Sequence, residues 1–138
     1  MRMKVLPHVM RNINEFNIPA GYEVLYFGVN LILMFNYSLA FDIEVKNSYD
    51  EIQVLIVSRK DIPGWKENND IISSKIKPYY DRSGLKINDV FRPIISDAYA
   101  FVLNNRKSSI SQVKTVEVTL IHNWQQEVKE SQLKDLIK

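Results

Sequence analysis

Apolar side chains recur over the first sixteen residues at spacings of three and four, which is typical of one face of a helix. Pro7 falls in the first turn of that segment, where a missing N–H does little harm. The pattern predicts an amphipathic helix over about residues 4–16, ended by the turn-forming residues 18–21. Its apolar positions are Val5, Leu6, Val9, Met10, Ile13 and Phe16.

From residue 22 to residue 58 the pattern changes to a period of two. Apolar Phe41, Ile43 and Val45 alternate with charged residues, as in a strand with one buried face. A turn-forming segment follows, and then a run rich in Ile and Val, so residues 41–58 are predicted to form a hairpin. The predicted antiparallel meander contains four strands, at about residues 22–29, 31–37, 41–46 and 51–58. A helix over residues 25–35 stays open as an alternative.

The second half of the chain alternates predicted helix and strand. We expect a short helix that starts near Asn69 or Asp70 and ends at Pro78, a longer helix over residues 88–103, a strand over residues 116–121 and a C-terminal helix over residues 123–137. The expected fold class is therefore α+β. It has an antiparallel sheet of four to five strands, a meander plus a late strand, packed by N-terminal, central and C-terminal helices in one domain over residues 1–138.

The composition narrows the range of functions. The 138 residues include no Cys, which excludes disulfides, thiolate nucleophiles and thiolate metal sites. The net charge of +2 is too small to indicate a polyanionic partner. The most apolar stretch, Val24–Phe41, is interrupted by two asparagines, so we expect buried sheet rather than a membrane span. With no apolar run suited to a signal peptide near the N-terminus, the expected location is the cytoplasm.

No catalytic constellation emerges from the sequence. His8 and His122 are the only histidines, so no histidine-rich metal site is predicted, and an acid–base pair for RNA cleavage is the one enzymatic use they suggest. Four glycines do not make a phosphate-binding loop, and no serine lies in a nucleophile-elbow context. We therefore predict no catalytic residue, no metal and no cofactor, and these observations favour a protein that is not an enzyme over one that is.

The acidic residues of the predicted hairpin form the first candidate site. Four acids and one base lie between residues 39 and 51, and Asp42 and Glu44 share one face of a strand. Such a surface favours a basic partner by speeding encounter and fixing orientation. Tyr49 and Trp65 are candidate aromatic anchors. The predicted protein interface is Asp42, Glu44, Tyr49, Asp50, Glu51 and Trp65.

A basic, aromatic segment forms the second candidate site. Between residues 75 and 114 there are eight bases and three acids, and two tyrosines lie among the cations. Bases of single-stranded RNA stack on such rings while Lys and Arg hold phosphates. The predicted nucleic-acid site is Lys75, Lys77, Tyr79, Tyr80, Arg82, Arg106 and Lys107.

Two functions follow from these sites. The first is a protein-binding module. In its small size, lack of cysteine and lack of catalytic groups the chain resembles the immunity proteins that bacteria use against toxins, a likeness of class carried by no motif. It implies a cognate toxin, such as a nuclease, whose basic cleft the acidic hairpin would occlude. The alternative is a small RNA-binding protein or RNase that uses the basic segment, with His122 as acid or base. A homodimer through an open sheet edge is a further partner option.

Overall fold

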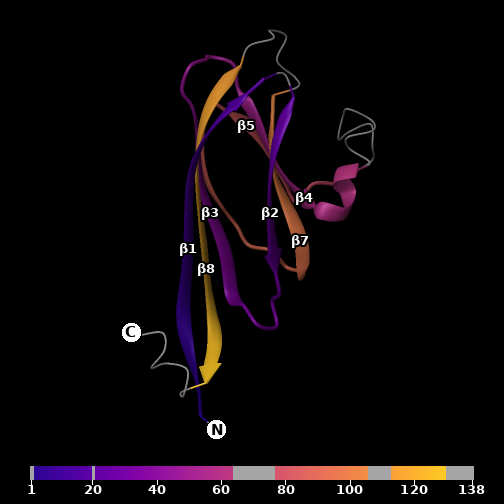
Figure 1. Ribbon diagram of the computed structural model, residues 1–138. Helices are drawn as coiled ribbons and strands as arrows, with labels where there is room; N and C mark the ends of the chain where they lie inside the picture. Colours follow the sequence, from indigo (N-terminus) through magenta and orange to yellow (C-terminus); the bar gives the residue numbers. More distant parts are fainter. Residues whose placement is uncertain (1, 20, 64–76, 106–112, 130–138) are drawn as a thin grey trace.

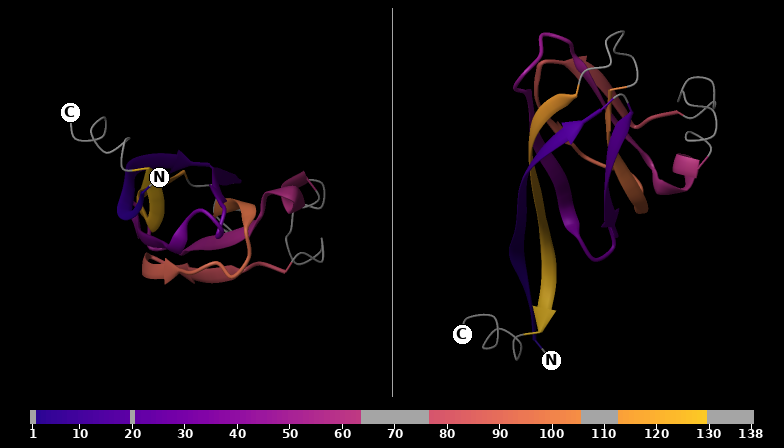
Figure 2. Two further views of the ribbon diagram at one scale, coloured as in Figure 1. Left: turned by 90° about the horizontal axis from the view of Figure 1, so that it is seen from below. Right: turned by 45° about the horizontal axis from the view of Figure 1, so that its top comes forward.

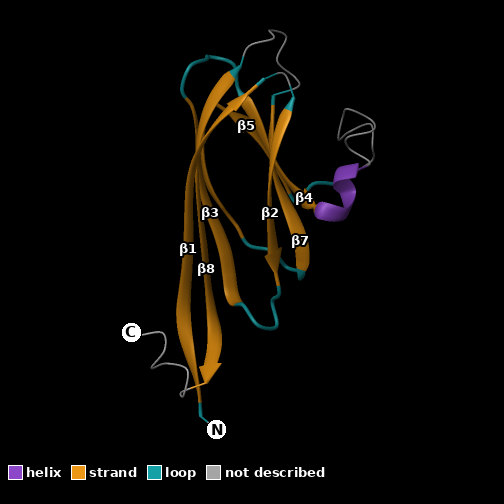
Figure 3. Ribbon diagram, viewed as in Figure 1, coloured by secondary structure: helices purple, strands orange, loops and turns teal. Residues whose placement is uncertain are grey.

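The described part of the chain is built almost entirely of β-strands. The computed structural model describes residues 2–19, 21–63, 77–105 and 113–129. Within these ranges a single short helical segment is present, and it begins with the 3-10 turn η1 (Arg59–Asp61) (Figure 3). The strands are β1 (Met3–Ile18), β2 (Tyr22–Val29), β3 (Phe35–Val45), β4 (Ile52–Ser58), β5 (Tyr80–Gly84), β6 (Lys86–Phe91), β7 (Asp97–Asn104) and β8 (Lys114–Lys129).

These strands form two four-stranded antiparallel sheets that face each other. One sheet has the order β1-β8-β3-β6 and the other β2-β7-β4-β5. Of the strands in the described residues, only β4 and β5 are neighbours both in sequence and in the same sheet; every other consecutive pair crosses between the sheets (Figure 1). This strand order is that of a jelly roll, a β-sandwich built from two Greek keys.

The predicted meander and its hairpin are wrong. β3 pairs with β8 and β6, whereas β4 pairs with β7 and β5 in the opposite sheet. The alternation in residues 41–46 correctly placed Phe41, Ile43 and Val45 on the buried face. Alternation reports which face of a strand is buried and contains no information about the neighbouring strand. The assumption that consecutive strands pair therefore produced the error.

The N-terminal helix is also wrong, because residues 4–16 belong to β1. The apolar residues Val5, Val9 and Ile13 are four positions apart. A spacing of four places side chains on one face of a helix and equally on one face of a strand. The sixteen-residue pairing of β1 with β8 decides between the two structures.

The central helix over residues 88–103 is replaced by β6, a turn and β7. Pro93 lies in that turn, and a proline in a helix interior costs about 3 kcal/mol, so its position argued against a helix. Residues 99–104 of β7 are buried on both faces, which removes the alternation that marks a half-buried strand.

The C-terminal helix is contradicted over residues 123–129, which continue β8. Asn123 and Gln126, the expected capping box, are paired with Val9 and Leu6 of β1. The rest of that helix, and most of the short helix expected before Pro78, lie outside the described residues. With β-strands in place of all the testable helices, the α+β class is wrong and the fold is all-β.

The main core fills the space between the two sheets. It includes Leu39, Phe41 and Ile43 from β3 and Val116 and Val118 from β8, all nearly inaccessible to solvent. A second, smaller cluster lies on the outer face of the β2-β7-β4-β5 sheet, where Ile62 packs on Leu55, Val57, Ala100 and Val102. Ile62, directly after η1, therefore covers this sheet on the side away from the main core.

A buried lysine lies at the end of the sandwich where β3 leads to β4. The ammonium of Lys114 donates a 2.8 Å hydrogen bond to the backbone oxygen of Glu51, and the residue is almost fully buried. Burial lowers the pKa of Lys114, and the nearby Asp50 partly offsets this effect. The described part of the chain contains no helix with the length and hydropathy that a membrane crossing requires.

The pairing of β3 with β8 is testable by cross-linking, since the chain has no native cysteine. Asp42 and Thr119 are directly opposed on the outer face of this pair. We expect Asp42→Cys with Thr119→Cys to form a disulfide under mild oxidation, because opposed strand residues lie within about 4.5–5.5 Å, inside the range a disulfide spans. The loss of free thiols on titration would measure it.

The matched control combines Asp42→Cys with Glu117→Cys, one diagonal step out of register. Efficient cross-linking of the control, or none in the Asp42 and Thr119 pair, would contradict the described register.

Candidate functional site

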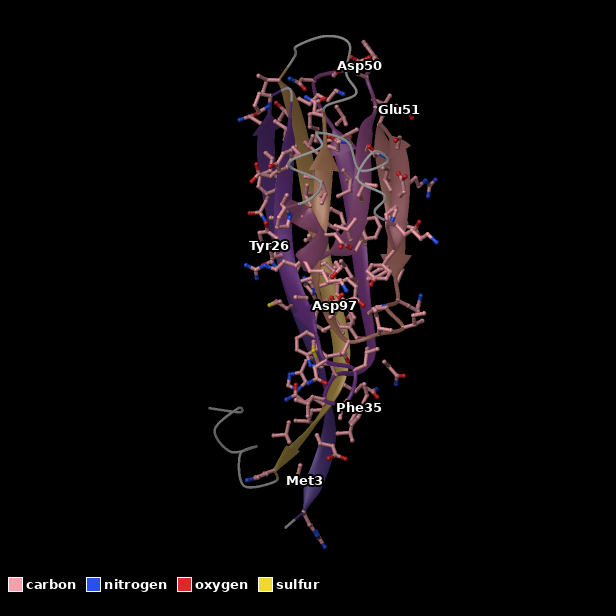
Figure 4. All side chains as sticks on the ribbon, turned by 90° about the vertical axis from the view of Figure 1, so that its right-hand side faces the viewer. Met3, Tyr26, Phe35, Asp50, Glu51 and Asp97 are labelled. Carbon is pink, nitrogen blue, oxygen red and sulfur yellow. The ribbon has the colours of Figure 1, made fainter. Side chains whose placement is uncertain are left out.

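The predicted interface residues are spread over more than one part of the molecule. Asp42 is exposed in the middle of β3, while Tyr49, Asp50 and Glu51 belong to the connection between β3 and β4. That connection lies at the end of the molecule opposite Met3 (Figure 4). Tyr49 is 97% exposed and Asp50 is half-buried. Trp65 lies outside the described residues.

The acidic face on β3 is real but partly neutralised. Glu44 lies directly opposite Glu117 of β8, which in turn lies opposite Glu15 of β1. The ammonium of Lys46 bridges two of these carboxylates, 3.3 Å from Glu44 and 3.5 Å from Glu117. The hydrogen bond to Glu44 raises the pKa of Lys46, so the cation persists. Exposed pairs of this kind contribute little to stability, and here they reduce the net charge that a basic partner would meet.

The structure describes four of the seven predicted nucleic-acid residues, and three of these four contact neighbouring side chains. The hydroxyl of Tyr80 donates a 2.9 Å hydrogen bond to Asp89, and the guanidinium of Arg82 lies 3.5 Å from the same carboxylate. Burial raises the pKa of Tyr80 to about 12, with the Asp89 bond adding to it. The ring of Tyr79 packs edge-on against Tyr99, and Lys77 is exposed.

Lys75, Arg106 and Lys107 lie outside the described residues. Because Tyr80 is half-buried and hydrogen-bonded, its face is less available to a stacking base than the sequence suggested. RNA binding stays a prediction.

Sequence reasoning missed the most unusual surface, which is strand β1. This strand is an edge of its sheet, paired on one side only, and it continues with β8 beyond the rest of the sandwich (Figure 1). Val5, Val9 and Ile13 project from its outer face with exposures of 51%, 66% and 59%. We call these three residues the apolar row.

The apolar row has no apolar neighbour directly across on its own sheet. The residues of β8 opposite Val5, Val9 and Ile13 are Glu127, Asn123 and Thr119. A long edge strand with exposed apolar side chains is a template for pairing with another strand, and natural proteins usually protect such edges. Only Pro7 and Arg11, between members of the row, act as protecting residues here.

On its other face β1 borders a cavity between the two sheets. The cavity has a volume of about 230 Å³. Its lining contains no Asp, Glu, Lys or Arg, and most of it is apolar or aromatic. The lining residues are Met10, Asn12, Asn14, Leu25, Tyr26, Phe27, Gly28, Met34, Tyr37, Leu120, His122 and Trp124.

A buried histidine supplies the central polar group of this cavity. His122 is 3% exposed, and its Nδ1 lies 2.5 Å from the hydroxyl of Tyr37. Burial lowers the pKa of His122 and raises that of Tyr37, so both groups are neutral near pH 7. Asn36, at the bulge in β3 just before Tyr37, has a positive φ of 53°, a conformation that asparagine tolerates.

Aromatic rings continue outward from His122. Phe27 packs edge-on against the imidazole with ring centres 5.5 Å apart, and Tyr37 lies between His122 and Trp124. His8 stacks on Trp124 at 5.4 Å with nearly parallel planes. The two histidines share the inner face of the β1–β8 pair, but only His122 lines the cavity.

Comparison with known proteins identifies the fold and no family. No protein-family model matches the chain. No curated protein matches it either. One similar solved structure comes from work titled "Bacillus endospore appendages form a novel family of disulfide-linked pili", with a TM-score of 0.54, 8% sequence identity and 90% of each chain covered. At this identity the likeness concerns the fold alone.

The buried histidine predicts a pH dependence of stability. The folded protein holds His122 with a pKa below its ordinary value of 6.5, so the unfolded chain takes up the proton first as the pH falls. We expect the free energy of unfolding to decrease from about pH 6.5 downward, with a slope of up to about 1.4 kcal/mol per pH unit from this group. Chemical denaturation at a series of pH values measures the slope.

The slope should be smaller in His122→Gln and retained in the control His8→Gln. An NMR titration of the His122 imidazole in the wild-type protein measures its pKa directly and needs no substitution. An equal slope in all three proteins, together with an ordinary His122 titration, would show that the buried imidazole is not the source.

Proposed function

We propose that this chain is a protein-binding module that pairs with a second copy of itself through the free edge of β1. The apolar row carries this proposal, because it combines unpaired strand backbone with exposed side chains that need an apolar neighbour. Strand addition at a sheet edge is an established way for proteins to bind one another: main-chain hydrogen bonds provide affinity and alternate side chains provide specificity.

The spacing of the apolar row favours a second copy as the partner. Its outer members are each four residues from Val9, so the row is symmetric about that residue. An antiparallel pairing of two β1 strands about a two-fold axis at Val9 places Val9 against Val9 of the partner subunit. The same register places Val5 against the partner's Ile13. All three members of the row then meet apolar residues, as an isologous interface requires.

Pro7 is compatible with this arrangement. A proline within a strand is tolerated where its missing N–H would point toward the free edge. In the proposed register Pro7 lies opposite Arg11 of the partner subunit, so the pairing lacks one donor on each side of the axis and keeps the others. This loss weakens the interface without breaking it, since a backbone hydrogen bond contributes about 0.5–1.5 kcal/mol net.

The similar solved structure comes from work on pili, and it shares with this chain the fold. Its title describes pili, which are assemblies of many subunits, and calls them disulfide-linked. The present chain has no cysteine, so its own assembly would be noncovalent. Nothing in the structure or in the comparisons supports an immunity protein or a toxin inhibitor. The acidic residues at the β3–β4 connection lie away from the proposed interface.

Size-exclusion chromatography with light scattering over a wide concentration range, about 1–500 μM, tests the proposal. A wide range is needed because a strand pair must offset an association cost of about 4–15 kcal/mol, so the dimer is expected to dissociate on dilution. We expect the mass to rise toward that of a dimer with increasing concentration. Val9→Lys should keep the protein monomeric, because it places two ammonium groups together at the axis. Ile32→Lys, at another exposed isoleucine, should leave the dimer intact.

Site-specific cross-linking tests the register. Val9→Cys should oxidise to a covalent dimer, and Ile32→Cys should not. A protein that stays monomeric throughout the range would refute self-association. A dimer that is indifferent to Val9→Lys would place the interface elsewhere.

A further inference from the structure

We propose that the cavity between β1 and β2 binds a small uncharged aromatic molecule of the size of phenol or indole, with one hydrogen-bonding group directed at His122. This inference is independent of self-association, because the apolar row and the cavity lie on opposite faces of β1.

The size and charge of the cavity restrict the ligand first. A volume of about 230 Å³ lies below the roughly 300–1,000 Å³ typical of sites for drug-sized ligands, so one or two fused rings are the largest suitable body. No ionised side chain lines it, and His122 and Tyr37 are neutral near pH 7. An ion transferred there from water would lose hydration without gaining a partner of opposite charge.

The apolar lining favours an aromatic body. Phe27, Tyr37 and Trp124 present ring surfaces, and ring pairs gain about 0.5–1.5 kcal/mol beyond simple burial when offset or edge-on. Met10 and Met34 add thioether groups, which make favourable contacts with aromatic rings and adapt to irregular shapes. A sugar ring would need many more hydrogen bonds than the amides of Asn12 and Asn14 and one imidazole provide.

The imidazole supplies the orienting contact. Its Nδ1 is engaged by the hydroxyl of Tyr37, and among the described residues no hydrogen-bond partner is present for Nε2. A neutral imidazole has one donor nitrogen and one acceptor nitrogen, and the bond at one nitrogen fixes the role of the other. When the Tyr37 hydroxyl donates to Nδ1, Nε2 carries the proton and donates to the ligand. Tyr37 is thus a positioning residue for His122.

Isothermal titration calorimetry with phenol, indole, benzyl alcohol, benzoate and glucose tests the inference on the full chain. We expect the neutral aromatic compounds to bind, and benzoate to bind at least about tenfold more weakly than benzyl alcohol, because only its charge is unsuited to the lining. Ligand-induced shifts of the His122 imidazole in NMR spectra should accompany binding.

Two variants localise the site. Asn12→Phe places a large ring at an exposed position of the lining and should weaken binding by about tenfold or more, whereas Asn88→Phe on β6, outside the lining, should not. Tyr37→Phe preserves the ring, and should reduce the affinity for phenol more than the affinity for benzene. Circular dichroism melting confirms that each variant is folded.

Several results would overturn the inference. These are absence of binding by all neutral aromatic compounds, equal binding of benzoate and benzyl alcohol, preference for glucose, or binding that Asn12→Phe leaves unchanged. Each of these binding experiments can be carried out with the Val9→Lys variant as well as with the wild type. The test of ligand binding therefore stands even if the proposed self-association fails.

Discussion

The pairing of β1 with β8 is the interaction on which both the fold and its candidate sites depend. It is an unbroken antiparallel register from Met3 opposite Lys129 to Ile18 opposite Lys114. β8 also pairs with β3, so this one strand joins the N-terminal edge to the middle of its sheet. The same pairing exposes the outer edge of β1 and places the inner face of β1 along the cavity. Figure 2 shows the two strands continuing together past the remainder of the sandwich.

The alternation of β8 explains how a polar group comes to lie in the core. Val116, Val118 and Leu120 point inward, and the next inward position is His122. A histidine can occupy this buried position because one of its nitrogens forms a hydrogen bond with the Tyr37 hydroxyl. The neutral imidazole also packs against the surrounding aromatic rings. In this region the inward positions of β1 are asparagines and a methionine rather than bulky aliphatic residues, which leaves the space between the sheets incompletely filled.

The sequence was informative where one face of a strand is buried and the other is wet. Residues 22–29 were predicted as a strand with the bounds that β2 has, and the inward set on β3 was correct. The sequence pattern led to the wrong prediction of helices where both faces of a strand are buried, as in β7, and where apolar residues are four positions apart, as in β1. Strand order was not accessible, because the jelly roll pairs residues far apart in the chain. For the same reason the cavity could not be predicted: its lining comes from four strands in two sheets and from the connection between β2 and β3.

The free edge of β1 is the central claim, and amide hydrogen exchange measures it most directly. Within residues 3–15, the amides that face away from β8 should exchange rapidly in dilute protein. These amides should become protected as the concentration rises through the dimerisation range, since pairing engages backbone groups that are otherwise solvated. Peptides from the other edge strands, β2, β5 and β6, should exchange at the same rate throughout. Protection of residues 3–15 that does not change with concentration, or added protection that appears at β2, β5 or β6 instead, would contradict the account.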